Sequence, residues 1–209
     1  ESLPAVRIRL DPLLTPSQNA QKYYKEYRKA RTAEEKLTGQ IEQARQELAY
    51  LDTVLEELSR AQTERDLEEI RQELREQGYI RPQRGKQRPL AASAPLEFSV
   101  PDGFRVLVGR NNRQNDRLTL KQADHNDIWF HTKNIPGSHT ILVTDGREPT
   151  EAAVLAAAKL AAFHSRAKDS SRVPVDYTRV RHVSKPQGAR PGMVIYVKYK
   201  TLYVTPEKE

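Results

Sequence analysis

The chain has no cysteine among its 209 residues. A disulfide framework, a thiolate nucleophile and a cysteine-ligated zinc site are therefore excluded. No apolar run approaches the ~20 residues that a membrane-spanning helix needs, and residues 1–4 offer neither the basic head nor the apolar stretch of a signal peptide. From these absences we expect a cytoplasmic protein without a membrane partner.

Positive charge exceeds negative charge, and the excess lies in one part of the chain. The sequence has 35 Lys and Arg residues against 28 Asp and Glu, a net charge of +7. Residues 1–77 carry 13 basic and 16 acidic side chains, whereas residues 78–209 carry 22 and 12, a net charge of +10. This asymmetry predicts a polyanionic partner for the second part, most often a nucleic acid, although a basic surface also serves solubility alone.

Residues 17–77 have the pattern of coiled-coil helices. Apolar residues recur at strict three- and four-residue intervals from Ala20 to Leu58, and only Glu34 interrupts them, which predicts a coiled-coil seam. A shorter second helix begins with Thr63 as its cap and ends before Gly78. Because a lone helix with an exposed seam is not stable, we expect self-association of two copies or a companion helix outside this chain.

The remaining segments divide into a short strand, a linker and a mixed domain. Within residues 1–16, Ala5–Leu10 alternates like a strand but has no neighbour with which to form a hairpin. Residues 78–95 are basic and contain several prolines, which predicts a linker. Residues 96–209 alternate strand-like runs with helical ones, including an Ala-rich helix from Thr150 to about His164. The predicted fold class is α+β: a helical rod followed by a mostly antiparallel sheet with packed helices.

Within the mixed domain, several runs are assigned individually. Strands are predicted at Leu96–Val100, Phe104–Val108, Ile128–Thr132 and His139–Val143, and β-rich segments at residues 173–183 and 193–204. Asn115 or Asp116 is predicted to cap a short helix that runs to Ala123.

Catalysis is tested first, because the sequence contains five histidines. His125, His131 and His139 lie near Asp124 and Asp127, but their spacing matches no zinc motif. The sequence also has no Gly-x-Ser-x-Gly elbow, no phosphate-binding loop and no dinucleotide fingerprint. We therefore expect no enzyme activity, no cofactor and no metal.

The same residues suit binding better. The run from Gly109 to Asp116 supplies guanidinium and amide groups that hydrogen-bond phosphate, ribose and base edges. The run from Pro136 to His139 predicts a tight turn with backbone N–H groups suited to an oxyanion, and Trp129 shares a strand face with Asp127 and His131, where it can stack a base. Each has a plainer reading: Trp129 as a core residue, the asparagines as turn formers, and Arg110 as the partner of a carboxylate.

These motifs, in this order, resemble the signature of the NFACT-R domain of the NFACT family. The resemblance rests on Gly109–Asn112, Asn115–Thr119, Asp127–His131, Pro136–His139, Ala152–Ser165, Val175–Thr178, Lys185–Pro186 and Pro191–Gly192. It extends upstream to Leu10–Pro12, Asn19–Gln21, Glu69–Arg71 and Glu73–Leu74, which are similar to the end of the family's middle coiled coil.

The resemblance implies a ribosome-associated quality-control factor. Such a factor binds large ribosomal subunits obstructed by peptidyl-tRNA and helps recruit tRNA for C-terminal alanine tailing, so its partners are the large subunit, tRNA and rRNA. Residues 96–209 are then the RNA-binding domain. The family's N-terminal NFACT domain and helix-hairpin-helix segment are missing here, so we do not expect tailing by this chain alone. The predicted RNA-binding residues are Arg110, Asn111, Asn112, Arg113, Asn115, Asp116, Asp127, Trp129, His131, Lys133, Pro136, Gly137, Ser138, His139, Arg179 and Lys185.

Two other functions stay open at this point. Bacterial members of the resembled family have also been labelled fibronectin-binding proteins, so a surface adhesin is the alternative. A free-standing structural coiled coil is a third.

Overall fold

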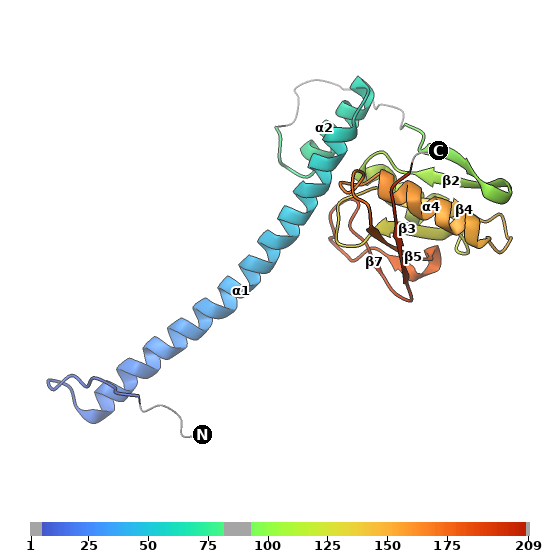
Figure 1. The fold of residues 1–209 in the computed structure, drawn as a ribbon. Coiled ribbons are helices and arrows are strands. Elements are labelled where there is room, and N and C mark those ends of the chain that lie inside the picture. Colours follow the sequence, from blue (N-terminus) through green and yellow to red (C-terminus); the bar gives the residue numbers. More distant parts are fainter. Residues whose placement is uncertain (1–5, 82–92, 208–209) are drawn as a thin grey trace. The chain divides into compact units, whose positions relative to one another are not determined.

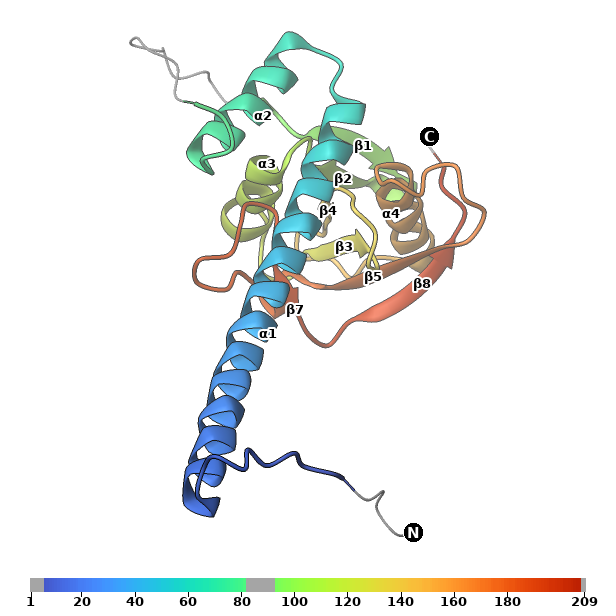
Figure 2. The same cartoon turned by 90° about the vertical axis from the view of Figure 1, so that its left-hand side faces the viewer.

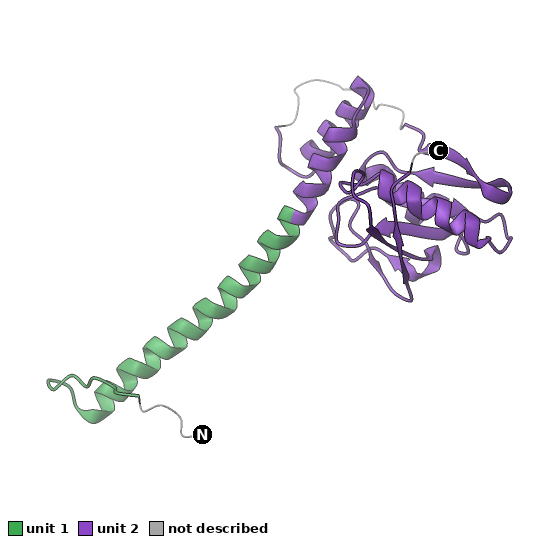
Figure 3. Cartoon of the chain, viewed as in Figure 1, with its two compact units in different colours: residues 1–48 green, residues 49–209 purple. Residues whose placement is uncertain are grey.

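The structure is a computed structural model that describes residues 6–81 and 93–207. It divides into two compact units, residues 1–48 and residues 49–209 (Figure 3). Helix α1 (Pro16–Arg60) runs through the boundary between them. Each unit is described by itself.

The first unit is a loop followed by the N-terminal part of α1. Thr15 caps the helix: its hydroxyl accepts from the backbone N–H of Gln18 at 3.2 Å, and the Gln18 side chain accepts from the Thr15 N–H at 2.8 Å. The buried side chain of Asn19 fixes the loop to the helix. Its Oδ1 accepts from the N–H of Asp11, and its Nδ2 donates to three backbone carbonyls of the loop. Over its described residues, the strand predicted at Ala5–Leu10 forms no ladder.

The second unit begins with a helical hairpin made of the last turns of α1 and helix α2 (Glu64–Glu76). The predicted cap is confirmed, because Thr63 and Asp66 form a capping box. Gly78, at φ 83°, follows the helix end in the left-handed region. Ile70 of α2 packs on Tyr50 and Val54 of α1, so the hairpin has its own small core.

An antiparallel sheet with packed helices forms the rest of the second unit (Figures 1 and 2). Among the described residues its strand order is β1-β2-β4-β3-β5-β8, and β6 and β7 form a separate ladder. The strands are β1 (Leu96–Val100), β2 (Phe104–Val108), β3 (Ile128–Thr132), β4 (Thr140–Val143), β5 (Val173–Arg179), β6 (Val183–Ser184), β7 (Ile195–Tyr196) and β8 (Lys200–Val204). The predicted α+β class, with helices ahead of an antiparallel sheet, is confirmed.

The two faces of the sheet carry different cores. Helix α4 (Glu151–Phe163), capped by Thr150, lays its alanines against one face. On the other face, Trp129 and Ile141 pack with Leu118, Val180 and Val183. The strand alternation predicted around Trp129 therefore holds, because Ile128 and Phe130 lie in the α4 core while Trp129 lies in the other.

The short helix before β3 differs from its prediction. Helix α3 (Asn112–Arg117) is capped by Asn111, whose side chain accepts from the Gln114 N–H at 2.9 Å. It continues into η2 (Leu118–Gln122), a π-helical turn. Asn115 lies inside the helix because Asn111 already has the extended backbone that a cap requires.

Candidate nucleic-acid interface

The Gly109–Asn115 motif follows β2 and closes tightly on the Pro136–His139 turn. A Cβ on Gly109 would come within 2.0 Å of Asn115 Oδ1, so only glycine fits there. Asn115 Oδ1 accepts from the His139 N–H at 3.1 Å, and Gly109 donates to the His139 carbonyl at 3.0 Å. The turn's Ser138 N–H is also used, because it donates to the His164 carbonyl at the end of α4. Of the turn's backbone N–H groups, which were predicted to receive an oxyanion, those of Ser138 and His139 thus have partners inside the protein.

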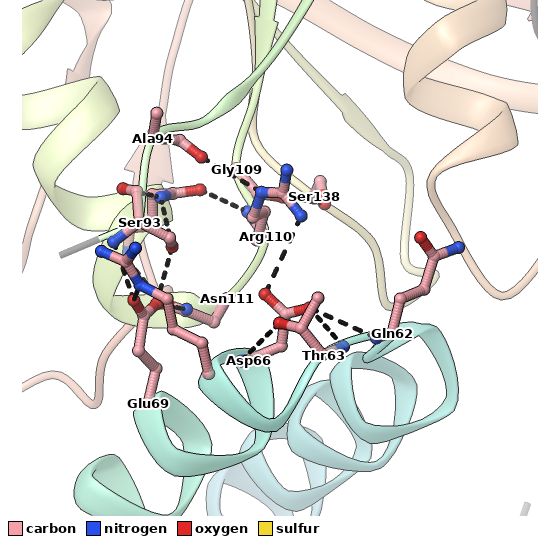
Figure 4. A network of polar contacts seen from close by, with 12 residues as sticks. Gln62, Thr63, Asp66, Glu69, Ser93, Ala94, Gly109, Arg110, Asn111 and Ser138 are labelled. Carbon is pink, nitrogen blue, oxygen red and sulfur yellow. Dashed lines mark hydrogen bonds and ion pairs between the residues drawn. The ribbon is translucent and has the colours of Figure 1, made fainter.

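Asn111 and Asn112 contact the helical hairpin, and Figure 4 shows the bond between Asn111 and Glu69. Asn111 Nδ2 donates to Glu69 Oε2 at 2.6 Å. Asn112 Nδ2 donates to Thr53 Oγ1 at 2.9 Å and to Glu73 Oε1 at 3.2 Å. Because these atoms are buried or part-buried, the bonds fix the root of the helical hairpin to the sheet.

Two arginines complete this junction. Arg60 Nη1, near the end of α1, donates to Ser138 Oγ at 2.7 Å. Arg110 Nη1 lies 3.8 Å from Asp66 Oδ1 and its Nε donates to the Ala94 carbonyl at 3.1 Å (Figure 4). The plainer reading of Arg110, a partner for a carboxylate, therefore describes its position in the structure.

Buried carboxyl groups lie at the centre of the junction. Glu73 Oε1 accepts from the Tyr50 hydroxyl at 2.7 Å, and both Glu57 and Glu73 are almost fully buried. Burial raises the pKa of Glu57 well above its ordinary value, and the charge of Glu73 adds to the effect. Burial likewise raises the pKa of Glu73.

The Trp129 cluster lies on the sheet face opposite α4. Trp129 is only 1% exposed. His131 stacks on its ring at 5.7 Å between centroids, while His139 meets the ring edge-on at 5.3 Å and Tyr196 lies at 4.7 Å. The structure thus brings Trp129, His131 and the Pro136–His139 turn together as predicted, but it encloses the indole among side chains.

The pKa values of both imidazoles of this cluster are shifted downward. Burial lowers the pKa of His139 to about 3, and the nearby His131 contributes. Burial also lowers the pKa of His131. His139 Nδ1 lies 2.8 Å from Thr119 Oγ1, and its Nε2 lies 3.1 Å from the Gly192 carbonyl. Over residues 6–81 and 93–207, no group of three or more His, Asp or Glu side chains is arranged to hold a metal ion.

Asp127 and Asp116, the two aspartates among the predicted RNA-binding residues, hold loops of the protein in place. Asp127 Oδ1 accepts from the N–H and hydroxyl of Thr144, at 2.8 and 3.0 Å. Asp116 pairs with Lys185 and accepts from the Gly192 N–H at 3.1 Å. These bonds hold the 185–192 loop against α3.

The sixteen predicted residues fall into two groups by burial. The buried ones are Asn111, Asn112, Asn115, Asp127, Trp129, Gly137, Ser138 and His139. The partly exposed ones are Arg110, Arg113, Asp116, His131, Lys133, Pro136, Arg179 and Lys185. Of the partly exposed cations, Arg113 pairs with Glu76 at 3.2 Å, Lys133 with Asp176 at 3.6 Å and Arg179 with Glu148 at 2.6 Å.

In the C-terminal part of the surface, sequence reasoning named only Arg179 and Lys185. Residues 177–206 contain no Asp or Glu but six Lys and Arg residues. The same stretch carries the exposed tyrosines Tyr199 and Tyr203. The absence of acidic residues over thirty positions was the available signal. It was overlooked because charges were counted over residues 78–209 as a whole.

Comparisons with known proteins agree with this architecture. Residues 1–91 match the model of the NFACT N-terminal and middle domains, and residues 95–197 match that of the NFACT protein RNA binding domain. All of the chain aligns, at 45% identity, with 37% of "Rqc2 homolog RqcH" from Bacillus subtilis. The Streptococcus suis protein of the same name is 42% identical over 98% of the chain and 37% of its own length. The chain thus spans 37% of the length of these curated relatives.

A solved structure matches as well. The C-terminal part of the fibronectin/fibrinogen-binding protein from Streptococcus suis superposes with a TM-score of 0.85 and 40% identity, over 94% of this chain and 78% of that one. Residues 95–197 thus form an NFACT RNA-binding domain. The chain as a whole belongs to the NFACT family.

Proposed function

We propose that this chain is the ribosome- and RNA-binding part of a cytoplasmic ribosome-associated quality-control factor. It binds large ribosomal subunits obstructed by peptidyl-tRNA, through rRNA and tRNA, and helps recruit tRNA for C-terminal alanine tailing of the stalled nascent chain. The peptide bonds are made by the ribosome, so the chain contributes binding and no catalysis. The family assignment and the names of its relatives support this proposal. No helix in the described residues is long and apolar enough to cross a membrane.

One observation carries the proposal: a basic stretch without acidic residues covers the end of the matched RNA-binding domain and continues beyond it. Residues 177–206 hold Arg179, Arg181, Lys185, Arg190, Lys198 and Lys200 and no carboxylate side chain. Phosphate contacts by such cations dominate RNA affinity. In this proposal Arg113, Lys133, Arg179 and Lys185 contact RNA directly, whereas the buried motif residues act by holding the loops that present them.

The test is binding of the chain to purified large ribosomal subunits and to tRNA at two salt concentrations. Affinity should fall steeply with salt because each phosphate contact releases counterions. The double variant Lys198→Glu, Lys200→Glu should weaken binding and reduce the salt slope, whereas Lys25→Glu, Lys29→Glu in the first unit is the matched control. An absence of RNA binding at low salt would contradict the proposal.

A second candidate function is binding of fibronectin. It is favoured by the match to the Streptococcus suis fibronectin/fibrinogen-binding protein, whose C-terminal part has the same fold at 40% identity. The same preparation should therefore be tested against immobilised fibronectin. Fibronectin binding that survives at high salt, together with no RNA binding at low salt, would establish this alternative.

A further inference from the structure

The face of the sheet opposite α4 is covered around Trp129 of β3 but is open toward β8, the outer strand next to β5. Val175, Leu202 and Val204 pack in the α4 core. Their neighbours in sequence therefore point to the other face. The register places His131 beside Asp176 and Asp176 beside Thr201, and it places Pro174 beside Tyr203.

Two exposed tyrosines lie on this open face, and each has a cation against its ring. Tyr203 is 61% exposed and Tyr199 46% exposed. Lys133 Nζ lies 4.9 Å from the centroid of the Tyr199 ring, and Arg172 Cζ lies 4.9 Å from that of Tyr203. Exposed aromatic rings with adjacent cations are what single-stranded nucleic acid binds, since bases stack on the rings and phosphates meet the cations.

A buried carboxylate holds this face in place. Asp176, almost fully buried, accepts from the Tyr196 hydroxyl at 2.8 Å and from the Thr201 hydroxyl at 2.6 Å, and it lies 3.6 Å from Lys133 Nζ. Tyr196 meets Tyr199 edge-on, with 5.2 Å between centroids. Both the ring of Tyr199 and its cation are thus positioned before any ligand arrives, which reduces the ordering cost of binding.

We propose that Tyr199 and Tyr203 stack unpaired bases of RNA, with Lys133 and Arg172 binding the adjoining phosphates. This inference rests on the proposed RNA-binding function and specifies the form of RNA: unpaired nucleotides rather than duplex. In a duplex the base faces are already stacked on one another, so a flat aromatic face gains little from it. An acid-free stretch also favours a polyanion over an apolar peptide as the occupant. Trp129, which sequence reasoning placed in this role, instead supports the face from beneath through Tyr196.

The experiment measures fluorescence anisotropy of the full chain with a labelled single-stranded RNA and with a blunt-ended, two-strand RNA duplex of matched length. The variants are Tyr199→Ala, Tyr203→Ala and the double variant. Tyr199→Phe and Tyr203→Phe keep the ring, and Tyr24→Ala removes an exposed tyrosine of the first unit as the control. Thermal unfolding of every variant checks the fold.

Each alanine variant should weaken single-strand binding about tenfold, because one stacked base is lost. Duplex binding, the phenylalanine variants and Tyr24→Ala should stay within about twofold of the unchanged chain. Unchanged single-strand affinity in the folded double variant would overturn the stacking site while leaving RNA binding intact. If the unchanged chain binds neither RNA at low salt, the proposed function itself fails.

Discussion

Asn111 donates to the carboxylate of Glu69 at 2.6 Å while its side-chain oxygen caps α3 through the Gln114 N–H. One side chain therefore both begins a helix of the RNA-binding domain and fixes the helical hairpin to it. Asn111→Ala should lower the free energy of unfolding by about 1–3 kcal/mol, since it removes a cap and a charge-assisted hydrogen bond. Asn111→Asp keeps the cap oxygen but brings a second negative charge against Glu69, so it should also destabilise.

Urea unfolding of both variants measures this effect. Gln43→Ala, on the exposed part of α1, is the control and should change stability by less than about 0.5 kcal/mol. An Asn111→Asp variant as stable as the unchanged chain would show that the contact with Glu69 contributes nothing.

The Gly109–Asn115 motif shows which features of the structure could be predicted from the sequence and which could not. The strands around Phe130, the cap at Thr63 and the alternation of Trp129 follow from local periodicity, and the structure confirms them. Clustered asparagine, arginine and histidine indicate a polar site equally well whether the partner is RNA or another element of the chain. Only the long-range contact between residues 49–77 and the sheet decides that Asn112 faces Glu73.

Glu57 should make stability depend on pH. Its pKa is raised in the folded state by burial and by Glu73, so the folded chain binds a proton more tightly than the unfolded chain. Stability is then highest below the ordinary pKa of a glutamate and falls as pH rises toward the raised value. Glu57→Gln should be more stable than the unchanged chain at pH 8 and should flatten the dependence.

Unfolding midpoints at several pH values between 5 and 8 check this expectation. Exposed Glu64→Gln is the matched control and should leave the slope unchanged. An identical slope in the Glu57→Gln variant would contradict the assignment.

His139 should also make stability depend on pH, but at acidic pH and in the direction opposite to that of Glu57. Its folded pKa, about 3, lies below its ordinary value because the ring is buried. The unfolded chain therefore binds the proton first, and stability falls as pH decreases from about 6.5 toward 3, by up to about 1.4 kcal/mol per pH unit. Nuclear magnetic resonance of the His139 ring should show an uncharged imidazole at pH 5, and a charged ring there would refute the prediction.

The coiled-coil seam should drive self-association of the chain. Leu37, Ile41, Leu48 and Leu55 are all more than half exposed. Tyr50 and Val54, which lie on another face of α1, are instead buried against α2, and of the seam residues Leu51 is the one that packs against this small core. Burial of such a Leu seam between two helices is favourable by roughly 25 cal/mol per Å² of apolar surface. We expect concentration-dependent dimers in sedimentation equilibrium.

Leu48→Asp together with Leu55→Asp should abolish these dimers, because the pair places charges in the seam without touching the buried face of α1. Gln21→Asp together with Gln46→Asp, on the side of the same helix away from the seam, should leave the dimers intact. RNA binding should be unchanged in both double variants, since the proposed RNA contacts lie beyond residue 96. A strict monomer at high micromolar concentration would refute pairing of two copies. The seam would then be expected to pair with a companion helix outside this chain.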